Sequence, residues 1–570
     1  MPPFLRKFIR SREVGLTLFA AVIGVIAAGF VALLSAAASI CHQLFFQLQP
    51  GGQLSGLAQF DNPFIPMAGG VLLCVLAWLG VRLGRTAVVD PIEANALYGG
   101  RMSFRDSMLL TLQTLVSNGF GASVGMEAGY TQLGSGAASS LGAMLRLRRE
   151  DLRVAVGCGA AGAIAAAFNG PLTGAFYAFE LVLAQYAVGY VAPIMAASIT
   201  AMFTMNVLGG APFALHVHID RPVVAGDIPW FMLLGLACAA IGIVWMRMLP
   251  LAERALSLTR APRMFHPIIG GLIVGELATL SPQVLAGGHG ALEFDLMVTA
   301  SLSTLAMLAL LKILATTISL GSGFRGGLFF ASLFVGALIG RAVALGIASA
   351  EPTLAIDTMA FSLVGMAALA SSVIGAPLTM SFLVMETTSD YGLTGAVLAA
   401  SITSSLLTRE LFGYSFSTWR FHLRGESVRS ARDVGWMRDL TVGKIMRTEP
   451  PSARANLTVG EFERLYPLGS HSRVALIDDV GQFCGIVVVA EAHVAGLDQN
   501  AAILSLARTS PPLTPTMSIK DAMRAFDRTE ADVLAVVDAP GSRKLVGTLK
   551  EAYAVRRYSD EMEKTQQFGL

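Results

Sequence analysis

The stretch PLTGAFYAFE, Pro171 to Glu180, returns later in the chain as PLTMSFLVME, Pro377 to Glu386. The two copies share Pro, Leu, Thr, Phe and Glu in register and lie 206 residues apart. Upstream of each copy is a glycine-rich segment, GASVGME at Gly121 to Glu127 and GFRGGLF at Gly323 to Phe329, and these segments are 202 residues apart. Internal similarity at a fixed separation predicts that one structural unit is present twice.

The composition indicates a membrane protein with several spans. Of 570 residues, 54% are hydrophobic and 14% charged, and the mean hydropathy of +0.62 is far too high for a soluble globular chain. The net charge is only +2, and basic residues stand at the ends of apolar segments, so no nucleic-acid partner is expected. Four of the five cysteines lie in apolar segments without paired spacing, which predicts neither a disulfide framework nor a metal site.

The first apolar run, Val14 to Ile40, is too long for the core of a signal peptide and suits a retained, tilted span. Positive charge next to a span favours the cytoplasmic side. The residues that carry such charge before this run are Arg6, Lys7, Arg10 and Arg12. The N-terminus is therefore predicted to be cytoplasmic.

Apolar segments continue to about Phe412, and glycine or proline interrupts many of them. Lipid cannot satisfy free backbone N–H groups, so broken segments at membrane depth are typical of a buried binding site. We predict a transmembrane domain over residues 1–425, with repeats at roughly 14–215 and 228–425 and the site at their interface.

After Phe412 the pattern changes to short apolar runs that alternate with helical stretches. We expect a linker at 426–440 and then a soluble α/β domain made of two similar parts, 441–498 and 499–570. Each part has a proline-containing lead, a helix and two strands.

Three motifs together resemble the CLC family of anion channels and anion/proton exchangers. They are GMEAG at 125–129, GSGFRGGLFFASL at 321–333 and NGPLTGAFYAFE at 169–180. The C-terminal domain resembles the paired CBS domain that accompanies many members. The resemblance implies an all-α membrane domain of inverted repeats with broken helices, a homodimer, and a bacterial inner membrane location with both termini cytoplasmic.

The resemblance also implies a site in which backbone amides at helix N-termini bind an anion, most simply chloride. Such amides and the helix dipole attract anions, and glycines allow close approach. The predicted amide donors are Gly125, Met126, Gly327, Leu328 and Phe329. Glu127 is the predicted gate, because its carboxylate can occupy an anion site and leave it on protonation. The alternative is a Glu at an exposed helix end that only complements the dipole.

Two expected side-chain ligands of the family are absent. Its first anion-binding motif falls on AVVDP, Ala87 to Pro91, where Val88 stands at the serine position and Asp90 adds a negative charge. Asp90 either lines the vestibule or, as we prefer, caps the next helix. Ser417 stands at the pore tyrosine position and offers one hydrogen bond at most.

Proton coupling in the family uses an internal glutamate, and Leu181 stands at that position. Glu180 precedes it and is a candidate proton relay. Its repeat counterpart Glu386 favours the alternative that each carboxylate bonds backbone inside the protein. Loss of the internal carboxylate is typical of a channel but does not exclude exchange.

No cofactor is required for this function, and no catalytic or metal-binding residues are predicted. An adenine nucleotide at the CBS pair is a further prediction, resting on Thr548 and Glu551 in GTLKEAY, with a purely structural domain as the alternative. The sequence thus predicts transport of chloride or a related small anion, as a channel or a proton-coupled exchanger. The rival hypothesis is a membrane sensor without transport.

Overall fold

The computed structural model describes residues 13–49, 51–82, 84, 88–210, 221–259, 261–353, 356–423, 440–539 and 541–558. The four basic residues before the first span, Ala87 and nearly all of the predicted linker 426–440 lie outside these ranges. The chain forms two compact units, Met1–Asp433 and Val434–Leu570.

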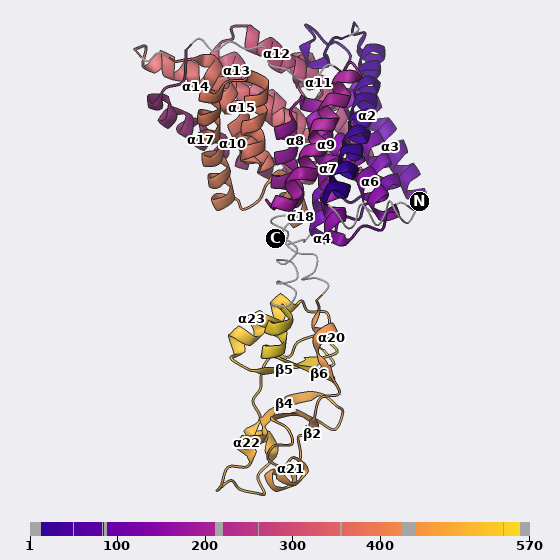
Figure 1. Cartoon of the computed structure of the whole chain (residues 1–570), viewed down its shortest axis with the longest axis vertical. Coiled ribbons are helices and arrows are strands. Elements are labelled where there is room, and N and C mark those ends of the chain that lie inside the picture. Colours follow the sequence, from indigo (N-terminus) through magenta and orange to yellow (C-terminus); the bar gives the residue numbers. More distant parts are fainter. Residues whose placement is uncertain are drawn as a thin grey trace. The chain divides into compact units, whose positions relative to one another are not determined.

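The regular elements of the first unit are all helices among its described residues (Figure 1). Its first half contains α2 (Glu13–Phe46), α3 (Phe64–Arg82), α4 (Pro91–Leu97), α5 (Phe104–Gly119), α6 (Glu127–Met144), α7 (Arg149–Phe168), α8 (Pro171–Tyr177) and α9 (Val188–Val207). Its second half contains α10 (Ile228–Ser257), α11 (His266–Leu280), α12 (His289–Met297), α13 (Leu302–Ser322), α14 (Phe329–Ala350), α15 (Thr358–Ile374), α16 (Pro377–Thr388), α17 (Tyr391–Leu411) and α18 (Phe416–Leu423). Short helical turns lie between them: η1 (Leu54–Gly56), the π-helical η2 (Ala178–Leu183), η3 (Ala225–Asp227), η4 (Arg263–Phe265) and η5 (Pro282–Val284).

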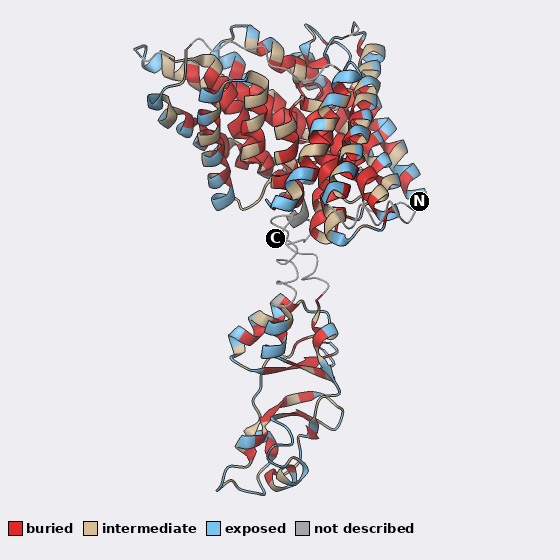
Figure 2. Cartoon of the chain, viewed as in Figure 1, coloured by how far each residue is buried: buried red, intermediate tan, exposed pale blue. Residues whose placement is uncertain are grey.

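This unit has the character of a polytopic membrane protein. Eight helices within the described ranges are long and apolar enough to cross a membrane. Buried residues fill the middle of the bundle, and exposed positions line the outer helices (Figure 2). Many of the exposed positions on α2, α3 and α10 are large and apolar, including Leu33, Val75 and Leu233, which suits helix faces in contact with lipid.

Proline and short polar side chains begin many of the helices. Pro91, Pro171 and Pro377 stand in the first turn of α4, α8 and α16, where a missing N–H costs nothing. The side chains of Ser301 and Asp357 accept hydrogen bonds from the first-turn amides of α13 and α15. These residues fix where the chain enters each helix.

The two halves use the same close helix crossing. Gly134 on α6 lies against Gly159 on α7, and Gly336 on α14 lies against Gly365 on α15. A Cβ atom at any of these four positions would come within 3.0 Å of the partner's carbonyl oxygen, a distance that real Cβ atoms essentially never show. Small residues at a crossing let helix backbones approach closely inside a membrane. The paired crossings therefore pack α6 on α7 and α14 on α15 in the same way.

The second unit contains two small sheets and short helices. Its helices are α20 (Val442–Ile445), α21 (Val459–Leu465), α22 (Val489–Ala492), the short η6 (Ile503–Leu506) and α23 (Ile519–Thr529). Its strands are β1 (Arg447–Thr448), β2 (Ser452–Arg454), β3 (Arg473–Ile477), β4 (Phe483–Val488), β5 (Val533–Val537) and β6 (Leu545–Lys550). The strand orders are β1-β6-β5 and β2-β3-β4, and among the strands that the structure describes β2 and β3 are paired in parallel and the others antiparallel.

The two predicted parts of this unit exchange segments. Val442 and Ile445 of α20 pack in one core with Phe526 of α23, and β1 pairs with β6. Ile503 packs instead with Phe462 of α21 in the other core. The predicted boundary between 498 and 499 therefore divides the sequence but not the packing, since each core contains residues from both sides of it.

Candidate functional site

The two glycine-rich breaks meet in the middle of the first unit. Gly125 N–H donates to the Gly327 carbonyl at 3.0 Å, and Gly327 N–H donates to the Gly125 carbonyl at 3.1 Å. The result is an isolated antiparallel bridge between the two repeats. It satisfies backbone groups that lipid could not satisfy.

Reciprocal hydrogen bonds hold the two breaks in place. Ser123 N–H donates to the hydroxyl of Ser319 on α13 at 3.0 Å, and Arg325 N–H donates to the hydroxyl of Ser117 on α5 at 2.9 Å. Ser117 and Ser319, like Ser123 and Arg325, are separated by the same 202 residues as the two breaks. Contacts that are repeated in both directions are what a local two-fold relation between the repeats would produce.

Helices α6 and α14 begin directly after these breaks. Their N-cap residues are Met126 and Leu328, and neither side chain makes a capping hydrogen bond. At the start of α6 the Glu127 carboxylate bonds its own backbone N–H instead. First-turn N–H groups of a helix need an external acceptor. Both helix ends meet at the bridge, so the structure brings together the five residues predicted to donate their amides. The N–H groups of Gly125 and Gly327 are already bonded to each other's carbonyls, which leaves those of Met126, Leu328 and Phe329 for an anion.

Glu127 is the first residue of α6 and is buried, with 4% of its surface exposed. The alternative of an exposed helix end is therefore wrong. Its Oε2 atom is buried and has no hydrogen-bond partner among the described residues. The carboxylate folds back over the bridge. It occupies the space that a Cβ atom on Gly125 would need, and its Oε2 atom lies 3.7 Å from where a Cβ atom on Gly327 would be.

Aromatic side chains surround one side of the bridge. The Phe329 ring lies 5.0 Å from the ring of Phe168 and 6.2 Å from that of Tyr177. The Tyr177 hydroxyl is hydrogen-bonded to Thr131, whose own hydroxyl donates to the Glu127 carbonyl at 2.9 Å. Tyr177 was missed from the sequence, where it is one of several aromatic residues in an apolar repeat.

Lys312 was missed as well. It is a fully buried lysine on α13 that interacts electrostatically with Glu127. The signal was present in the sequence, because LALLKILATT at 308–317 places one charge in the middle of an apolar segment.

The segment with Val88 and Asp90 lies before α4. Asp90 Oδ1 accepts hydrogen bonds from the amides of Ile92 at 2.8 Å and Glu93 at 2.9 Å, so it caps α4 as the preferred hypothesis stated. Val88 is partly exposed and brings no polar side-chain atom. A contribution of either residue to anion binding stays a prediction.

Each glutamate that ends a copy of the PLT repeat binds the helix of the other copy. Glu180 accepts from Leu378 N–H at 3.0 Å, Thr379 N–H at 2.8 Å and the Thr379 hydroxyl at 2.6 Å. Glu386 makes the same three bonds, at 2.7, 2.9 and 2.6 Å, to the start of α8. Each carboxylate therefore caps the PLT helix of the other repeat, which confirms the alternative that these groups bond backbone inside the protein.

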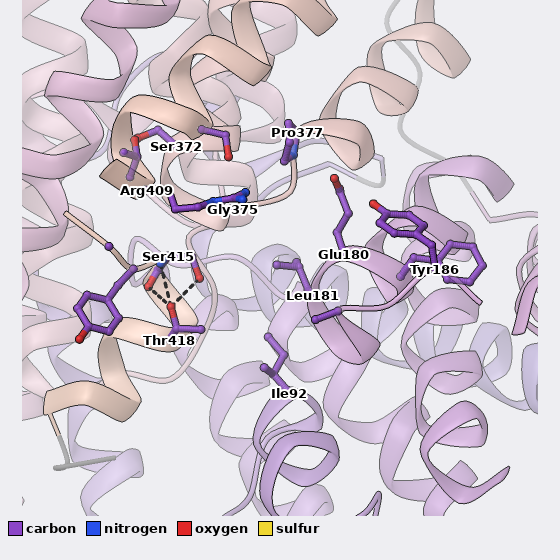
Figure 3. A pocket seen from close by; sticks show the side chains of 16 residues that line it. Ile92, Glu180, Leu181, Tyr186, Ser372, Gly375, Pro377, Arg409, Ser415 and Thr418 are labelled. Carbon is purple, nitrogen blue, oxygen red and sulfur yellow. Dashed lines mark hydrogen bonds between the residues drawn. The ribbon is translucent and has the colours of Figure 1, made fainter. Parts of the chain in front are cut away.

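Glu180 also borders a cavity of about 510 Å³. Figure 3 shows Glu180 and Tyr186 on one side of this pocket, Ser415 and Thr418 on the other, and Leu181 between them. Ser415 and Thr418 flank Ser417 in sequence and line the pocket, whereas Ser417 is absent from its described lining. The relay role of Glu180 and the anion role of Ser417 stay predictions.

A separate cavity of about 610 Å³ lies within the second unit. Thr548 lines it together with the cationic side chains of Arg447, Arg473 and Lys550. Glu551 is not part of the described lining, and its N–H donates to the Asp532 carbonyl at 2.9 Å. The cavity thus contains one of the two predicted nucleotide residues and three cations that the sequence did not single out.

Comparisons with known proteins agree with this geometry. The family described as "Voltage gated chloride channel" matches residues 69–409. A ClcB-like protein of Ralstonia nicotianae is 32% identical over 346 residues, which cover 60% of this chain and 80% of that protein. The voltage-gated ClC-type chloride channel ClcB of Citrobacter koseri is 26% identical over 405 residues, 69% of this chain and 96% of the relative. The crystal structure of a slow cyanobacterial Cl⁻/H⁺ antiporter has the same fold, with a TM-score of 0.61 at 21% identity over 72% of this chain and 97% of that one.

Proposed function

This chain belongs to the voltage gated chloride channel family, and we propose that it transports chloride or a related small anion across a membrane through the site at Glu127. The observation that carries the proposal is the meeting of two helix N-termini, neither capped by its N-cap side chain, at one buried carboxylate with an unpartnered oxygen. The free N–H groups at such helix N-termini can replace part of an anion's hydration shell. No cationic side chain needs to contact the anion directly.

Glu127 acts as the gate of this pathway. Its carboxylate lies against Gly125 and near Gly327, between the starts of α6 and α14, so an anion and the ionised side chain would compete for one place. Protonation removes the negative charge and frees the place. The pathway therefore opens as the carboxyl takes up a proton.

Anion flux from liposomes tests the gate. Glu127→Gln mimics the protonated side chain, so its chloride efflux should exceed wild type at pH 7 and lose its dependence on pH. Glu276→Gln is the matched control, because Glu276 is exposed on α11 and its substitution should change neither quantity. Unchanged flux and unchanged pH dependence in Glu127→Gln would remove the gate assignment.

A proton-coupled exchanger is the second candidate. It is favoured by the position of Glu180, whose carboxylate borders the cavity next to Leu181. The fold neighbour from a cyanobacterium is described as a Cl⁻/H⁺ antiporter. A chloride gradient imposed without a proton gradient should then drive uphill proton movement. Proton movement that stays at the background of protein-free liposomes would leave the channel.

Three further features belong to the same proposal. The protein acts as a homodimer in a bacterial inner membrane, with both termini in the cytoplasm. The second unit is a CBS pair, in which Arg447, Arg473 and Lys550 would bind the phosphates of an adenine nucleotide and Thr548 its ribose. Calorimetric titration of the full chain with ATP tests the nucleotide site, and Lys550→Met should weaken the binding. A membrane sensor without transport remains the rival, and it would be supported if no anion flux occurs.

A further inference from the structure

Lys312 is a cation with no role in the anion pathway proposed above. It lies in the middle of α13, and none of its surface is exposed. A charged side chain inside a membrane protein is costly, and it persists where it serves a site or pairs with another group. The question is which group this charge serves.

The surroundings of Lys312 fit the charged form. Its Nζ atom donates to the carbonyl oxygens of Ala286 at 2.8 Å, Val284 at 3.0 Å and Leu285 at 3.4 Å. An ammonium group has three N–H donors and no acceptor, whereas a neutral amine would turn its lone pair towards one of the three oxygens. The three carbonyls satisfy the hydrogen bonds but leave a full positive charge in the core.

That charge acts on the gate. The hydroxyl of Thr316, one turn after Lys312 on α13, lies 3.0 Å from the hydroxyl of Ser123 in the break before Glu127. Ala286, one of the residues whose carbonyls hold Lys312, donates its N–H to the carbonyl of Gly121 in the same break at 3.4 Å. The Lys312 ammonium is therefore placed to attract the Glu127 carboxylate electrostatically, although no direct ion pair joins them among the described contacts. The carbonyls that bind Lys312 belong to the end of η5 and the loop after it. These segments do not contain Glu127, so Lys312 keeps its hydrogen bonds when the carboxylate moves.

Other titratable groups face this pair from the neighbouring elements. Within the described residues, Tyr130 of α6 and Tyr177 of α8 interact electrostatically with Glu127. Lys312 also faces His289, whose ring stacks on Phe330 with centroids 3.5 Å apart. The two phenols are neutral near pH 7, so they do not supply the positive potential.

We propose that Lys312 is a positioning residue whose fixed charge holds the ionised gate, and an anion that replaces it, at the paired helix N-termini. The inference rests on the proposed anion transport. Without the charge of Lys312, the Glu127 carboxylate should take up a proton and leave the helix N-termini more easily, because its ionised form loses an attractive partner. The pathway should then stay open to higher pH.

The test combines substitutions at Lys312 and Glu127 in a double-mutant cycle of chloride efflux against pH. In Lys312→Gln the pH of half-maximal flux should rise by about one unit, a tenfold change in proton affinity of the gate. Lys312→Arg keeps the charge and should restore the wild-type profile. In a Glu127→Gln background, Lys312→Gln should no longer shift the profile, because no titrating gate remains.

These outcomes separate a positioning role from a purely structural one. Loss of hydrogen bonds to the three carbonyls lowers stability in either gate background, but only an electrostatic role shifts the pH profile. If Lys312→Gln gives no monodisperse protein, Lys312→His serves instead, since an imidazole keeps its charge only below about pH 6.5. Its profile should follow Lys312→Arg at low pH and depart from it above that range.

An unshifted profile in Lys312→Gln, or an equal shift in both gate backgrounds, would overturn the inference while anion transport stands. Absence of chloride flux in the wild-type protein would overturn both the inference and the proposed function.

Discussion

Glu180 caps α16 and Glu386 caps α8, so we predict that both glutamates stabilise the fold and that substituting either one lowers the free energy of unfolding. Glu386→Gln keeps the size of the side chain but leaves one acceptor oxygen for three donors, on Leu172 and Thr173. Loss of one charge-assisted hydrogen bond costs about 1.5–3 kcal/mol. The neutral group also loses up to about 1 kcal/mol of interaction with the helix dipole. The free energy of unfolding should therefore fall by roughly 2–4 kcal/mol.

The measurement is thermal unfolding of the detergent-purified chain, followed by the loss of its monodisperse size-exclusion peak. We expect a midpoint about 2–4 °C below wild type. Glu180→Gln should lose at least as much, since Glu180 makes the same three bonds to Leu378 and Thr379 and a further one to the Tyr186 hydroxyl, and Glu276→Gln should lose nothing. If Glu180 also relays protons, only its substitution will change proton flux. A normal midpoint for one of the two glutamate variants, with a lowered one for the other, would refute the two-fold reasoning.

Two further predictions concern single positions. Gly125→Ala should displace the gate carboxylate and raise chloride flux at pH 7. Gly327→Ala should leave the flux unchanged, because the nearest atoms to a Cβ there are 3.6–3.7 Å away, an ordinary contact distance. Equal fluxes of the two variants would contradict this difference. The capping bonds from Thr458 lower the pKa of the Glu461 carboxyl, so its support of α21 is full above about pH 4.3 and is lost as the pH falls through the lower folded-state pKa. Glu461→Gln should therefore speed hydrogen exchange of the amides of residues 459–465 relative to wild type at pH 7 but not at pH 2. An equal effect at both pH values would show that the charge of Glu461 does not stabilise α21.

The repeat and its glycine-rich breaks could be predicted from the sequence because they are local patterns. Glycines before an apolar helix mark a backbone that must approach something closely, and the recurrence after 202 residues marks a counterpart. The structure adds that Gly125 and Gly327 pair with each other. Pairing between residues so far apart has no local signature.

Other features of the site depend on tertiary packing and could not be predicted in this way. The motif around Glu180 shows a polar end to an apolar helix, but not that α16 lies against it. Likewise Tyr177 belongs to the site only because η2 and α8 carry it towards Phe329. Lys312 differs from both, because a single lysine in an apolar segment by itself predicts a buried partner for its charge.

The exchanged caps also set an order of events during synthesis. The start of α8 leaves the ribosome long before its cap does, since Leu172 and Glu386 are 214 residues apart. At typical rates of chain elongation this delay is roughly 10 to 40 s. Throughout that interval the first repeat resides in the membrane with a helix end that its own sequence cannot cover. We therefore expect newly made first halves to be open to membrane proteases until the second half arrives, and a chain truncated before Glu386 to be degraded rather than accumulate.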